Sequence, residues 1–297
     1  MKLLVTGASG LLGSKLCELA IHQGIHVHSA YNRHRPSKGI PVEFDLSQKT
    51  KVEQAIERIK PETVVHAAAL TNVDKCEAEK DLSWKINVEG TEVIAKACKK
   101  NQAFLLYIST DYVFDGEKGM YTEKDVTNPI NYYGYTKLKG EDAVENSADE
   151  FCIARTSVIY GTTPATGKIN FALWLLDKLG KKEPVRIAND QSNSPTLNSN
   201  LASMILEILE SRLTGTFHLA GATRLTRFQY ATALAKEFDM DIDLIEPVSS
   251  DEISWSAKRP KDSSLNVEKA MRTLSNRPME IQTALGKMKR SWANQSG

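Results

Sequence analysis

The first thirteen residues constrain the fold more than any other part of the chain. Residues 2–6 form a short apolar run that ends in β-branched residues, which predicts a buried strand. Three evenly spaced glycines follow, Gly7, Gly10 and Gly13, and a helical pattern begins at Leu11. A strand, a glycine turn and a helix in this order predict a parallel α/β unit in which the backbone approaches a pyrophosphate at the helix N-terminus.

The alternation of strand and helix continues to residue 161. Further apolar runs separated by helical patterns lie at residues 63–66, 103–108 and 151–155. This order predicts an α/β fold with a Rossmann-type, doubly wound parallel sheet. After Gly161 the alternation loosens. We therefore expect an NADP-binding domain over residues 1–161 and a smaller, discontinuous mixed α/β substrate domain over 162–297, with the chain rejoining the first domain near 186–220.

The second predicted strand, residues 25–30, bears on the choice of cofactor. In a Rossmann unit the end of this strand faces the adenosine ribose, where an acid would bind the 2′-hydroxyl and repel a 2′-phosphate. The following residues include no acid but contain Asn32, Arg33 and Arg35. Because guanidinium groups suit phosphate, NADP(H) is favoured and NAD(H) stays possible. The alternative is a solvated basic loop without a ligand.

The sequence allows predictions for three further segments. Small residues, Ala67 to Ala69, follow the strand at 63–66, where a flat cofactor could lie against the backbone or a helix could pack tightly. A long helix is expected over about 78–100, in which Asn87 bonds to backbone. Another helix is expected over 225–238.

A hydroxyl and a Tyr–Lys pair carry the predicted chemistry. Tyr133 and Lys137 are four residues apart, so on a helix they share one face. We expect the ammonium to lower the pKa of the phenol, which could then hand a proton to a carbonyl oxygen. Thr110 comes just after the strand predicted at 103–108. Ligands of open α/β sheets bind at this end of a strand, so Thr110 could polarise the same carbonyl. This constellation predicts a carbonyl reductase.

Composition excludes several other classes. The net charge is +1, so no global field attracts nucleic acid or an acidic membrane. No apolar run reaches the ~18 residues of a membrane span. The four cysteines lack Cys-x-x-Cys spacing, and we expect them to be reduced. No metal site is expected, the location is expected to be cytoplasmic, and a homodimer is possible.

An ordered series of motifs along nearly the whole chain resembles a known family. The series comprises Gly7-x-x-Gly10-x-x-Gly13, His66-Ala67-Ala68-Ala69, Val73-Asp74-Lys75, Ser109 through Gly116, Tyr133-x-x-x-Lys137 with Gly140-Glu141, Arg155-Thr156-Ser157, Asp190-Gln191, Pro195-Thr196, and Arg259-Pro260 with Ser263. Together these motifs resemble the extended short-chain dehydrogenases/reductases, and among them the dTDP-4-dehydrorhamnose reductases. The resemblance implies hydride transfer from NADPH to C4 of a dTDP-4-keto-6-deoxysugar, giving dTDP-L-rhamnose.

The resemblance also assigns roles to residues. The implied catalytic residues are Thr110, which orients the carbonyl, Tyr133, the general acid, and Lys137, which tunes Tyr133 and holds the nicotinamide ribose. The implied cofactor-binding residues are Gly7, Ser9, Gly10, Leu11, Leu12, Gly13, Asn32, Arg33, Asp45, Leu46, Ala67, Ala68, Ala69, Tyr133 and Lys137. The implied substrate-binding residues are Thr71, Thr110, Asp111, Tyr112, Tyr133 and Val158.

Departures from the family pattern leave alternatives open. The family usually carries a tryptophan where this chain has Val158, which leaves the identity of the ketosugar open. The regulatory β subunit of methionine adenosyltransferase binds NADP and shares this departure, so a non-catalytic role is one alternative. A nucleotide-sugar dehydratase or epimerase is another, although Asp111 is followed by Tyr112 and not by the glutamate of the dehydratases.

Overall fold

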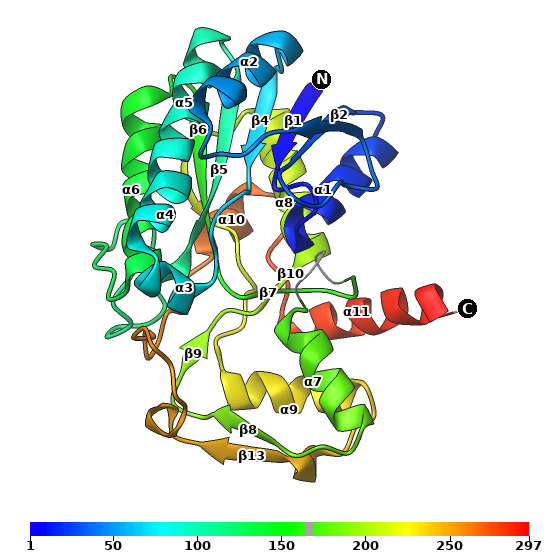
Figure 1. Ribbon diagram of the computed structural model, residues 1–297. Coiled ribbons are helices and arrows are strands. Elements are labelled where there is room, and N and C mark those ends of the chain that lie inside the picture. The colour runs from blue at the N-terminus through cyan, green and yellow to red at the C-terminus, as the bar shows by residue number, and fades with distance from the viewer. Residues whose placement is uncertain (164–168, 297) are drawn as a thin grey trace.

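The computed structural model describes residues 1–163 and 169–296 of the chain. Its largest element is a sheet of seven parallel strands in the order β11-β6-β5-β4-β1-β2-β3 (Figure 1). The strands are β1 (Lys2–Thr6), β2 (His26–Tyr31), β3 (Ile40–Glu43), β4 (Thr63–His66), β5 (Phe104–Thr110), β6 (Phe151–Thr156) and β11 (Gly215–His218). The predicted doubly wound parallel sheet is confirmed.

Helices cover both faces of this sheet because side chains of a buried strand alternate between two apolar layers. Leu3 and Val5 of β1 pack with one set of helices, and Leu4 packs with the other. The first set is α1 (Leu11–His22), α8 (Asn198–Ser211) and α10 (Glu268–Thr273). The second set is α2 (Lys49–Ile59), α5 (Gly90–Lys100) and α6 (Tyr132–Ser147).

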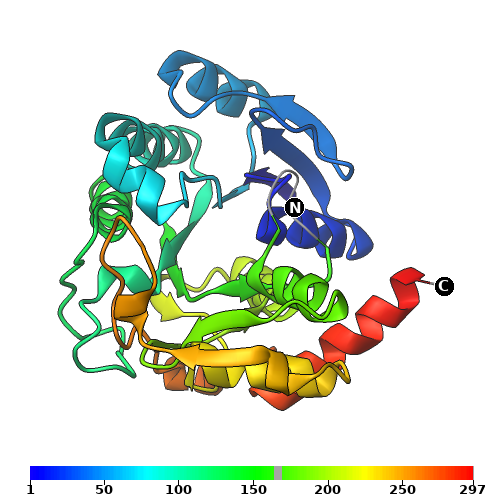
Figure 2. The same ribbon diagram turned by 60° about the horizontal axis from the view of Figure 1, so that its bottom comes forward.

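A smaller layer lies below the carboxyl ends of the strands in the view of Figure 1 and comes forward in Figure 2. Its helices are α7 (Phe171–Gly180), α9 (Arg227–Glu237) and α11 (Ile281–Ser296). Its strands form two-stranded pairs: β7 (Ile159–Tyr160) with β10 (Thr196–Leu197), β9 (Ser192–Asn193) with β12 (Leu225–Thr226), and β8 (Val185–Ala188) with β13 (Ile245–Val248). A separate apolar cluster holds this layer together.

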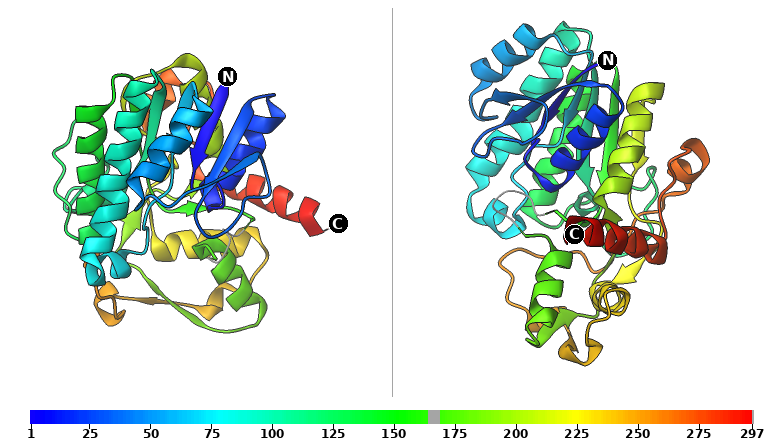
Figure 3. Two further views of the ribbon diagram at one scale, coloured as in Figure 1. Left: turned by 45° about the horizontal axis from the view of Figure 1, so that its top comes forward. Right: turned by 90° about the vertical axis from the view of Figure 1, so that its right-hand side faces the viewer.

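The chain crosses between the two parts more than once, which both views of Figure 3 show. After β8 it returns to the main sheet, where α8 packs beside α1 and β11 adds the edge strand next to β6. The proposed boundaries, 1–161 and 162–297, stay a prediction, and residues 164–168 of the second range lie outside the described part.

The helical segment predicted over about 78–100 is present as a continuous helical run from residue 80 to 100, with a π-helical turn in its middle. The structure has α3 (Val73–Ala78), α4 (Lys80–Trp84), a π-helical stretch η1 (Lys85–Glu89) and then α5. The π-helical stretch contains Asn87, whose side chain is buried and bonds outside its own helix. Widening the helix at this point is typical of a residue held by a neighbouring element at a functional site.

The helix predicted over 225–238 begins two residues later than expected. Thr226 accepts a hydrogen bond from the backbone N–H of Gln229, and the Gln229 side chain accepts one from the N–H of Thr226. This reciprocal capping box fixes the start of α9 at Arg227. Leu225 and Thr226 pair with β9 instead. Shorter segments complete the chain: η2 (Asp111–Val113), η3 (Ile242–Leu244) and η4 (Ser250–Glu252).

Candidate active site

The glycine turn packs directly against the segment that follows β4. Gly7 has a φ of +69°, and a Cβ placed on it would lie 2.9 Å from the backbone N of Ala68. A Cβ on Gly13 would lie 2.2 Å from the carbonyl oxygen of Gly7. Both positions therefore require glycine, one for its backbone conformation and the other for close packing.

The N-terminus of α1 offers free donors. Gly10 caps the helix with no side-chain hydrogen bond, and no acidic residue stands in the first turn. The described residues give the backbone N–H groups of Leu11, Leu12 and Gly13 no hydrogen-bond partner, so these donors and the helix dipole suit an anion. Ser9 lies within the same turn. The donor set fits the pyrophosphate of a dinucleotide.

Thr6 and His66 hold the backbone of the alanine segment. The Thr6 Oγ1 accepts hydrogen bonds from the N–H groups of Ala67 and Ala68, each at 3.1 Å. Thr6 Oγ1 also lies 2.7 Å from His66 Nδ1. Burial lowers the pKa of His66 to about 3, so the ring is neutral. No role was predicted for Thr6 from the sequence. The feature that could have indicated one is a hydroxyl side chain at the end of an apolar strand.

The predicted adenosine end is a small polar cavity of about 230 Å³ between the ends of β2 and β3. Asn32 and Asp45 both line it, and Asn32 Nδ2 donates to Asp45 Oδ2 at 2.8 Å. Burial acts to raise the pKa of Asp45, but hydrogen bonds from Ser47 and Asn32 outweigh it and lower the pKa. Arg33 is exposed beside this carboxylate, and Leu46 is buried against Gly90.

The three predicted catalytic residues come from two adjoining elements. Thr110 ends β5, and Tyr133 and Lys137 lie on α6, which packs on β5. The side chain of Asn131 caps α6 by accepting from the N–H of Gly134 at 2.9 Å. Thr110 lies close enough to Tyr133 to influence the pKa of its phenol. The structure therefore brings the predicted hydroxyl and phenol together.

Lys137 is buried and almost fully enclosed. Its Nζ donates to the carbonyl oxygen of Ile108 at 2.6 Å and lies 3.9 Å from the centre of the Tyr107 ring. Burial lowers the pKa of Lys137 to about 7, and the negative charge of Glu141 opposes that fall. Near neutral pH this amine therefore exchanges a proton readily.

The expectation that Lys137 lowers the pKa of Tyr133 is wrong for this structure. Burial of the phenol raises the pKa of Tyr133, and the neighbouring Thr110 side chain opposes the rise only in part. The ammonium of Lys137 is directed at the Ile108 carbonyl instead. Tyr133 consequently holds its proton at neutral pH, as a proton donor must.

Asp111 follows Thr110 in the chain, and its side chain is buried. Its Oδ1 accepts from Thr110 Oγ1 at 3.0 Å, and its Oδ2 accepts from Ser157 Oγ at 2.8 Å and Ser263 Oγ at 2.6 Å. Burial raises the pKa of Asp111, and these hydroxyl donors oppose the rise. Ser157 and Ser263 belonged to recognised motifs, but their joint role could not be seen in a linear sequence.

The other predicted substrate residues lie on three separate segments. The ring of Tyr112 meets the ring of Tyr133 edge-on, with 6.1 Å between their centres. Val158 is half-buried after β6, and its carbonyl accepts from the N–H of Thr196 at 2.9 Å. Thr71 is exposed in the segment after β4.

Asn87 ties together the two segments that flank Lys137. Its Oδ1 accepts from the N–H of Leu70 at 2.8 Å, and its Nδ2 donates to the Leu70 carbonyl and to Thr136 Oγ1, each at 3.1 Å. The predicted backbone-bonding asparagine is confirmed. The π-helical stretch thus fixes the alanine segment to α6.

An ion pair joins α3 to the segment around residue 259. Arg259 Nη2 donates to Asp74 Oδ2 at 2.8 Å, and Arg259 Nη1 donates to Asp74 Oδ1 at 3.1 Å. The guanidinium carbon of Arg259 also lies 5.4 Å from the centre of the Trp255 ring. The motifs Val73-Asp74-Lys75 and Arg259-Pro260, 185 residues apart, therefore meet in space.

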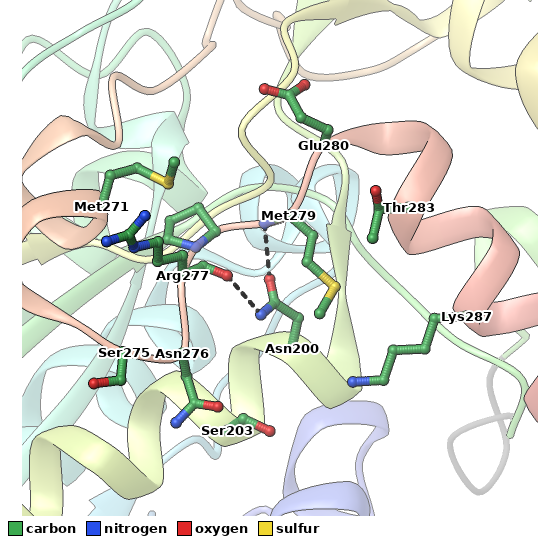
Figure 4. A pocket seen from close by; sticks show the side chains of 11 residues that line it. Asn200, Ser203, Met271, Ser275, Asn276, Arg277, Met279, Glu280, Thr283 and Lys287 are labelled. Carbon is green, nitrogen blue, oxygen red and sulfur yellow. Dashed lines mark hydrogen bonds between the residues drawn. The ribbon is translucent and has the colours of Figure 1, made fainter.

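A cavity of about 420 Å³ lies away from this centre, between the start of α8 and the segment that leads into α11 (Figure 4). In its wall Asn200 Oδ1 accepts from the N–H of Met279 at 3.1 Å, and Asn200 Nδ2 donates to the carbonyl of Arg277 at 3.0 Å. None of the predicted site residues lines it. We therefore place the candidate site at the carboxyl ends of the strands and not in this larger hollow.

Other site types have little support in the described part of the chain. There no cluster of three or more His, Cys, Asp or Glu side chains is arranged to hold a metal. All four cysteines are free and buried, which confirms that they are unpaired. Among the described helices, none combines the length and apolar character that crossing a bilayer requires.

Comparison with known proteins gives a consistent result. The family model of the RmlD substrate binding domain matches residues 1–293. The chain is 32% identical over 270 residues to the probable low-salt glycan biosynthesis reductase Agl14 of Haloferax volcanii, covering 90% of each chain. It is 31% identical over 275 residues to methionine adenosyltransferase 2 subunit beta of Rattus norvegicus, covering 90% of this chain and 81% of the relative.

Solved structures agree. A hypothetical dTDP-4-dehydrorhamnose reductase from Sulfolobus tokodaii superposes with a TM-score of 0.84 at 39% identity, covering 93% of this chain and 95% of that one. The dTDP-4-dehydrorhamnose reductase of Bacillus anthracis, solved in complex with NADP, superposes with a TM-score of 0.85 at 29% identity, covering 98% and 99%.

Proposed function

The chain belongs to the RmlD substrate binding domain family, and from that premise we propose that it is an NADPH-dependent reductase of a nucleotide ketosugar. The substrate is a dTDP-4-keto-6-deoxysugar, dTDP-4-dehydrorhamnose, and the product is dTDP-L-rhamnose. NADP(H) is the favoured cofactor, and NAD(H) stays possible. The observation that carries the proposal is the position of Tyr133 on α6 at the carboxyl end of β5, where its ring packs edge-on against Tyr112, two residues after Thr110.

Binding of the cofactor is assigned to the glycine turn and the alanine segment. The free N–H groups at the start of α1 receive the pyrophosphate, because the cap residue Gly10 has no side chain and the helix N-terminus attracts anions. Thr6 keeps the backbone of Ala67 and Ala68 in place beside that turn. NADPH, when bound, supplies the hydride.

The proton comes from the chain itself. Hydride addition to C4 of the sugar leaves negative charge on O4, and Tyr133 donates its phenolic proton to that oxygen. Before the sugar binds, the Thr110 hydroxyl donates its one proton to Asp111; with the sugar in place, Thr110 turns that proton to the ketone oxygen and orients the carbonyl. Lys137, with a pKa of about 7, stands one helical turn away as the group that returns a proton to Tyr133.

The experiment is a turnover assay. Purified protein given freshly generated dTDP-4-dehydrorhamnose should oxidise NADPH at a rate that depends on the ketosugar, with one rhamnosyl nucleotide formed per NADPH consumed. A panel of other nucleotide ketosugars tests whether Val158 has changed the choice of sugar. Absence of NADPH oxidation with every ketosugar in the panel would contradict the proposal.

A second candidate rests on the 31% identity to methionine adenosyltransferase 2 subunit beta. In that case the chain binds NADP and a synthetase but reduces no ketosugar. Co-purification of a methionine adenosyltransferase, together with an inactive turnover assay, would favour this role. A cytoplasmic location and a homodimer stay predictions, which fractionation and light scattering test.

A further inference from the structure

Thr6 and His66 lie side by side at the carboxyl ends of two neighbouring strands. They are register partners in the parallel pair of β1 and β4, and both side chains are buried. Thr6 Oγ1 has two lone pairs, and the N–H groups of Ala67 and Ala68 occupy both of them. The one hydroxyl proton of Thr6 is therefore the proton in the 2.7 Å contact with His66, so His66 Nδ1 accepts it.

The other ring nitrogen of His66 must donate. His66 Nε2 lies 3.0 Å from Thr91 Oγ1, and Thr91 already gives its only proton to the carbonyl oxygen of Asn87 at 2.7 Å. Thr91 can therefore only accept from His66. These contacts define the ring as the neutral tautomer that carries its proton on Nε2, and burial keeps it neutral by lowering its pKa to about 3.

A directed chain of hydrogen bonds follows from this assignment. The proton of Thr6 points to His66, the proton of His66 points to Thr91, and the proton of Thr91 points to the Asn87 carbonyl. The Asn87 side chain in turn bonds to the N–H and to the carbonyl of Leu70. The alanine segment, residues 67–69, is therefore held at its start by Thr6 and just beyond its end by Asn87. His66 connects the two anchors.

The alanine segment also lies against the glycine turn. A Cβ on Gly7 would lie 2.9 Å from the backbone N of Ala68, so the two backbones are in close contact. The proposed function assigns the dinucleotide to the surface that these two backbones form. A small shift of the segment would change the shape of that surface without removing any group from it, and binding depends on such a fit.

We infer that His66 is a positioning residue for the dinucleotide, because by accepting the Thr6 proton it directs both lone pairs of Thr6 to the backbone of the alanine segment. The ring acts through Thr6 and is not a catalytic residue. This inference rests on the proposed function, since the dinucleotide is the cofactor that the proposed function assigns to this surface.

The test compares two changes of a buried threonine to valine, which keep the shape of the side chain and remove its hydroxyl. Thr6→Val removes the acceptor of two backbone N–H groups. Thr63→Val is the matched control at the other end of β4, where the Thr63 hydroxyl donates to Met1 Sδ at 3.7 Å. The dissociation constant of NADPH is measured by fluorescence titration without a ketosugar, and kcat is measured at saturating NADPH.

Thr6→Val should weaken NADPH binding about 10-fold, the effect of one or two lost hydrogen bonds, and should raise the KM for NADPH in proportion. The value of kcat should stay nearly unchanged, because Tyr133 and Lys137 keep their own contacts. Thr63→Val should match the wild type in both quantities. A merely structural role of Thr6 would lower the free energy of unfolding and leave the affinity for NADPH unchanged.

Two further variants extend the test. Thr6→Ser restores the hydroxyl and should recover most of the lost affinity. Thr91→Val removes the acceptor of His66 Nε2 and should weaken NADPH binding in the same direction by a smaller factor. This variant also decides the question if Thr6→Val fails to fold, because an unchanged affinity in Thr91→Val then overturns the inference.

Other results would also overturn the inference. These are wild-type affinity for NADPH in a folded Thr6→Val variant, and equal weakening in Thr6→Val and Thr63→Val. Nitrogen-15 NMR of the wild type reads the ring directly, and it should show the proton of His66 on Nε2 and none on Nδ1. A proton on Nδ1 would contradict the proposed direction of the hydrogen bonds.

The outcomes separate the inference from the proposed function. If Thr6→Val binds NADPH like the wild type and the wild type reduces the ketosugar, the inference is wrong and the function stands. If NADPH binds in a Thr6-dependent way but no ketosugar is reduced, the reductase function is wrong and the positioning role of His66 stands.

Discussion

The candidate catalytic centre and the predicted adenosine end lie along the same edge of the sheet but are built in opposite ways. Lys137 and Asp111 are buried, and each makes short hydrogen bonds to neighbouring elements. Asn32 and Arg33, after β2, are exposed, and Asn32 makes one bond to Asp45. In the first region, packing determines both the position and the pKa of each group. In the second region, a bound ligand must supply the partner of each exposed side chain.

This difference predicts how large the effect of a substitution should be. Changing a buried catalytic group alters a pKa or leaves a charge without a partner, and the cost reaches several kcal/mol. Changing an exposed arginine removes one solvated contact, and salt weakens that contact further. The following experiments compare the size of the effect of substitutions in the two regions.

Tyr133→Phe should have the largest effect on activity. The ring still packs, but the proton is gone, so kcat should fall about 10³-fold, within the range for a general acid. The affinity for NADPH, measured by fluorescence titration, should change little. Steady-state turnover with full activity would remove Tyr133 from the mechanism.

Glu141→Gln tests how much a buried ion pair next to the candidate catalytic centre stabilises the fold. Glu141 accepts from Arg155 Nη2 at 2.6 Å and also accepts a hydrogen bond from Ser109, and both Glu141 and Arg155 are buried. Removing the carboxylate leaves a buried guanidinium without its partner, so the free energy of unfolding should fall by about 3 kcal/mol in urea titration.

Glu150→Gln is the matched control, because its ion pair with Arg212 has the same 2.6 Å length but is exposed on both sides. It should cost under about 1 kcal/mol. Equal losses in the two variants would show that burial does not set the strength of these pairs.

Lys137→Met should change how stability depends on pH. The pKa of Lys137 is about 7 in the folded chain against 10.5 for an unperturbed lysine, so the unfolded chain binds the proton more strongly. Between these values the free energy of unfolding should rise with pH, by on the order of 1 kcal/mol per unit from this residue. The variant should lack that rise in urea titrations at several pH values. Parallel curves would mean that Lys137 is not desolvated.

Arg33→Asp should have the smallest of these effects. An acid beside the adenosine ribose repels a 2′-phosphate, so the ratio of kcat/KM for NADPH over NADH should fall about 10-fold, and less at high salt. Arg35→Asp, two residues away, makes the same charge change and should leave the ratio nearly unchanged. If both variants shift the ratio equally, the loop acts through its net charge and not through Arg33.

The sequence predicts the sheet well because its signals are local. The glycine spacing from Gly7 to Gly13 and the apolar runs of the strands report backbone geometry and burial directly. The Tyr133 and Lys137 pair is likewise visible, because four residues make one helical turn. Local pattern does not reveal that Asn87 interrupts a helix, since the cause is a bond to Leu70 on another segment.

The electrostatics of the site could not be predicted in the same way. The expected effect of Lys137 on Tyr133 considered only two charges, whereas burial by many distant residues has the larger effect on the pKa of Tyr133. The bond from Ser263 to Asp111 spans 152 positions in the chain.

The hydrogen bond from Ser263 has a consequence for the order in which the enzyme matures on the ribosome. Chains are made from the N-terminus, and domains begin to fold during synthesis. Thr110, Tyr133 and Lys137 are all made well before Ser263, yet the carboxylate that holds Thr110 receives a hydroxyl from this serine, 152 positions after Asp111. A nascent chain can therefore form a cofactor-binding half early, while the completed catalytic geometry waits until Ser263 has been made.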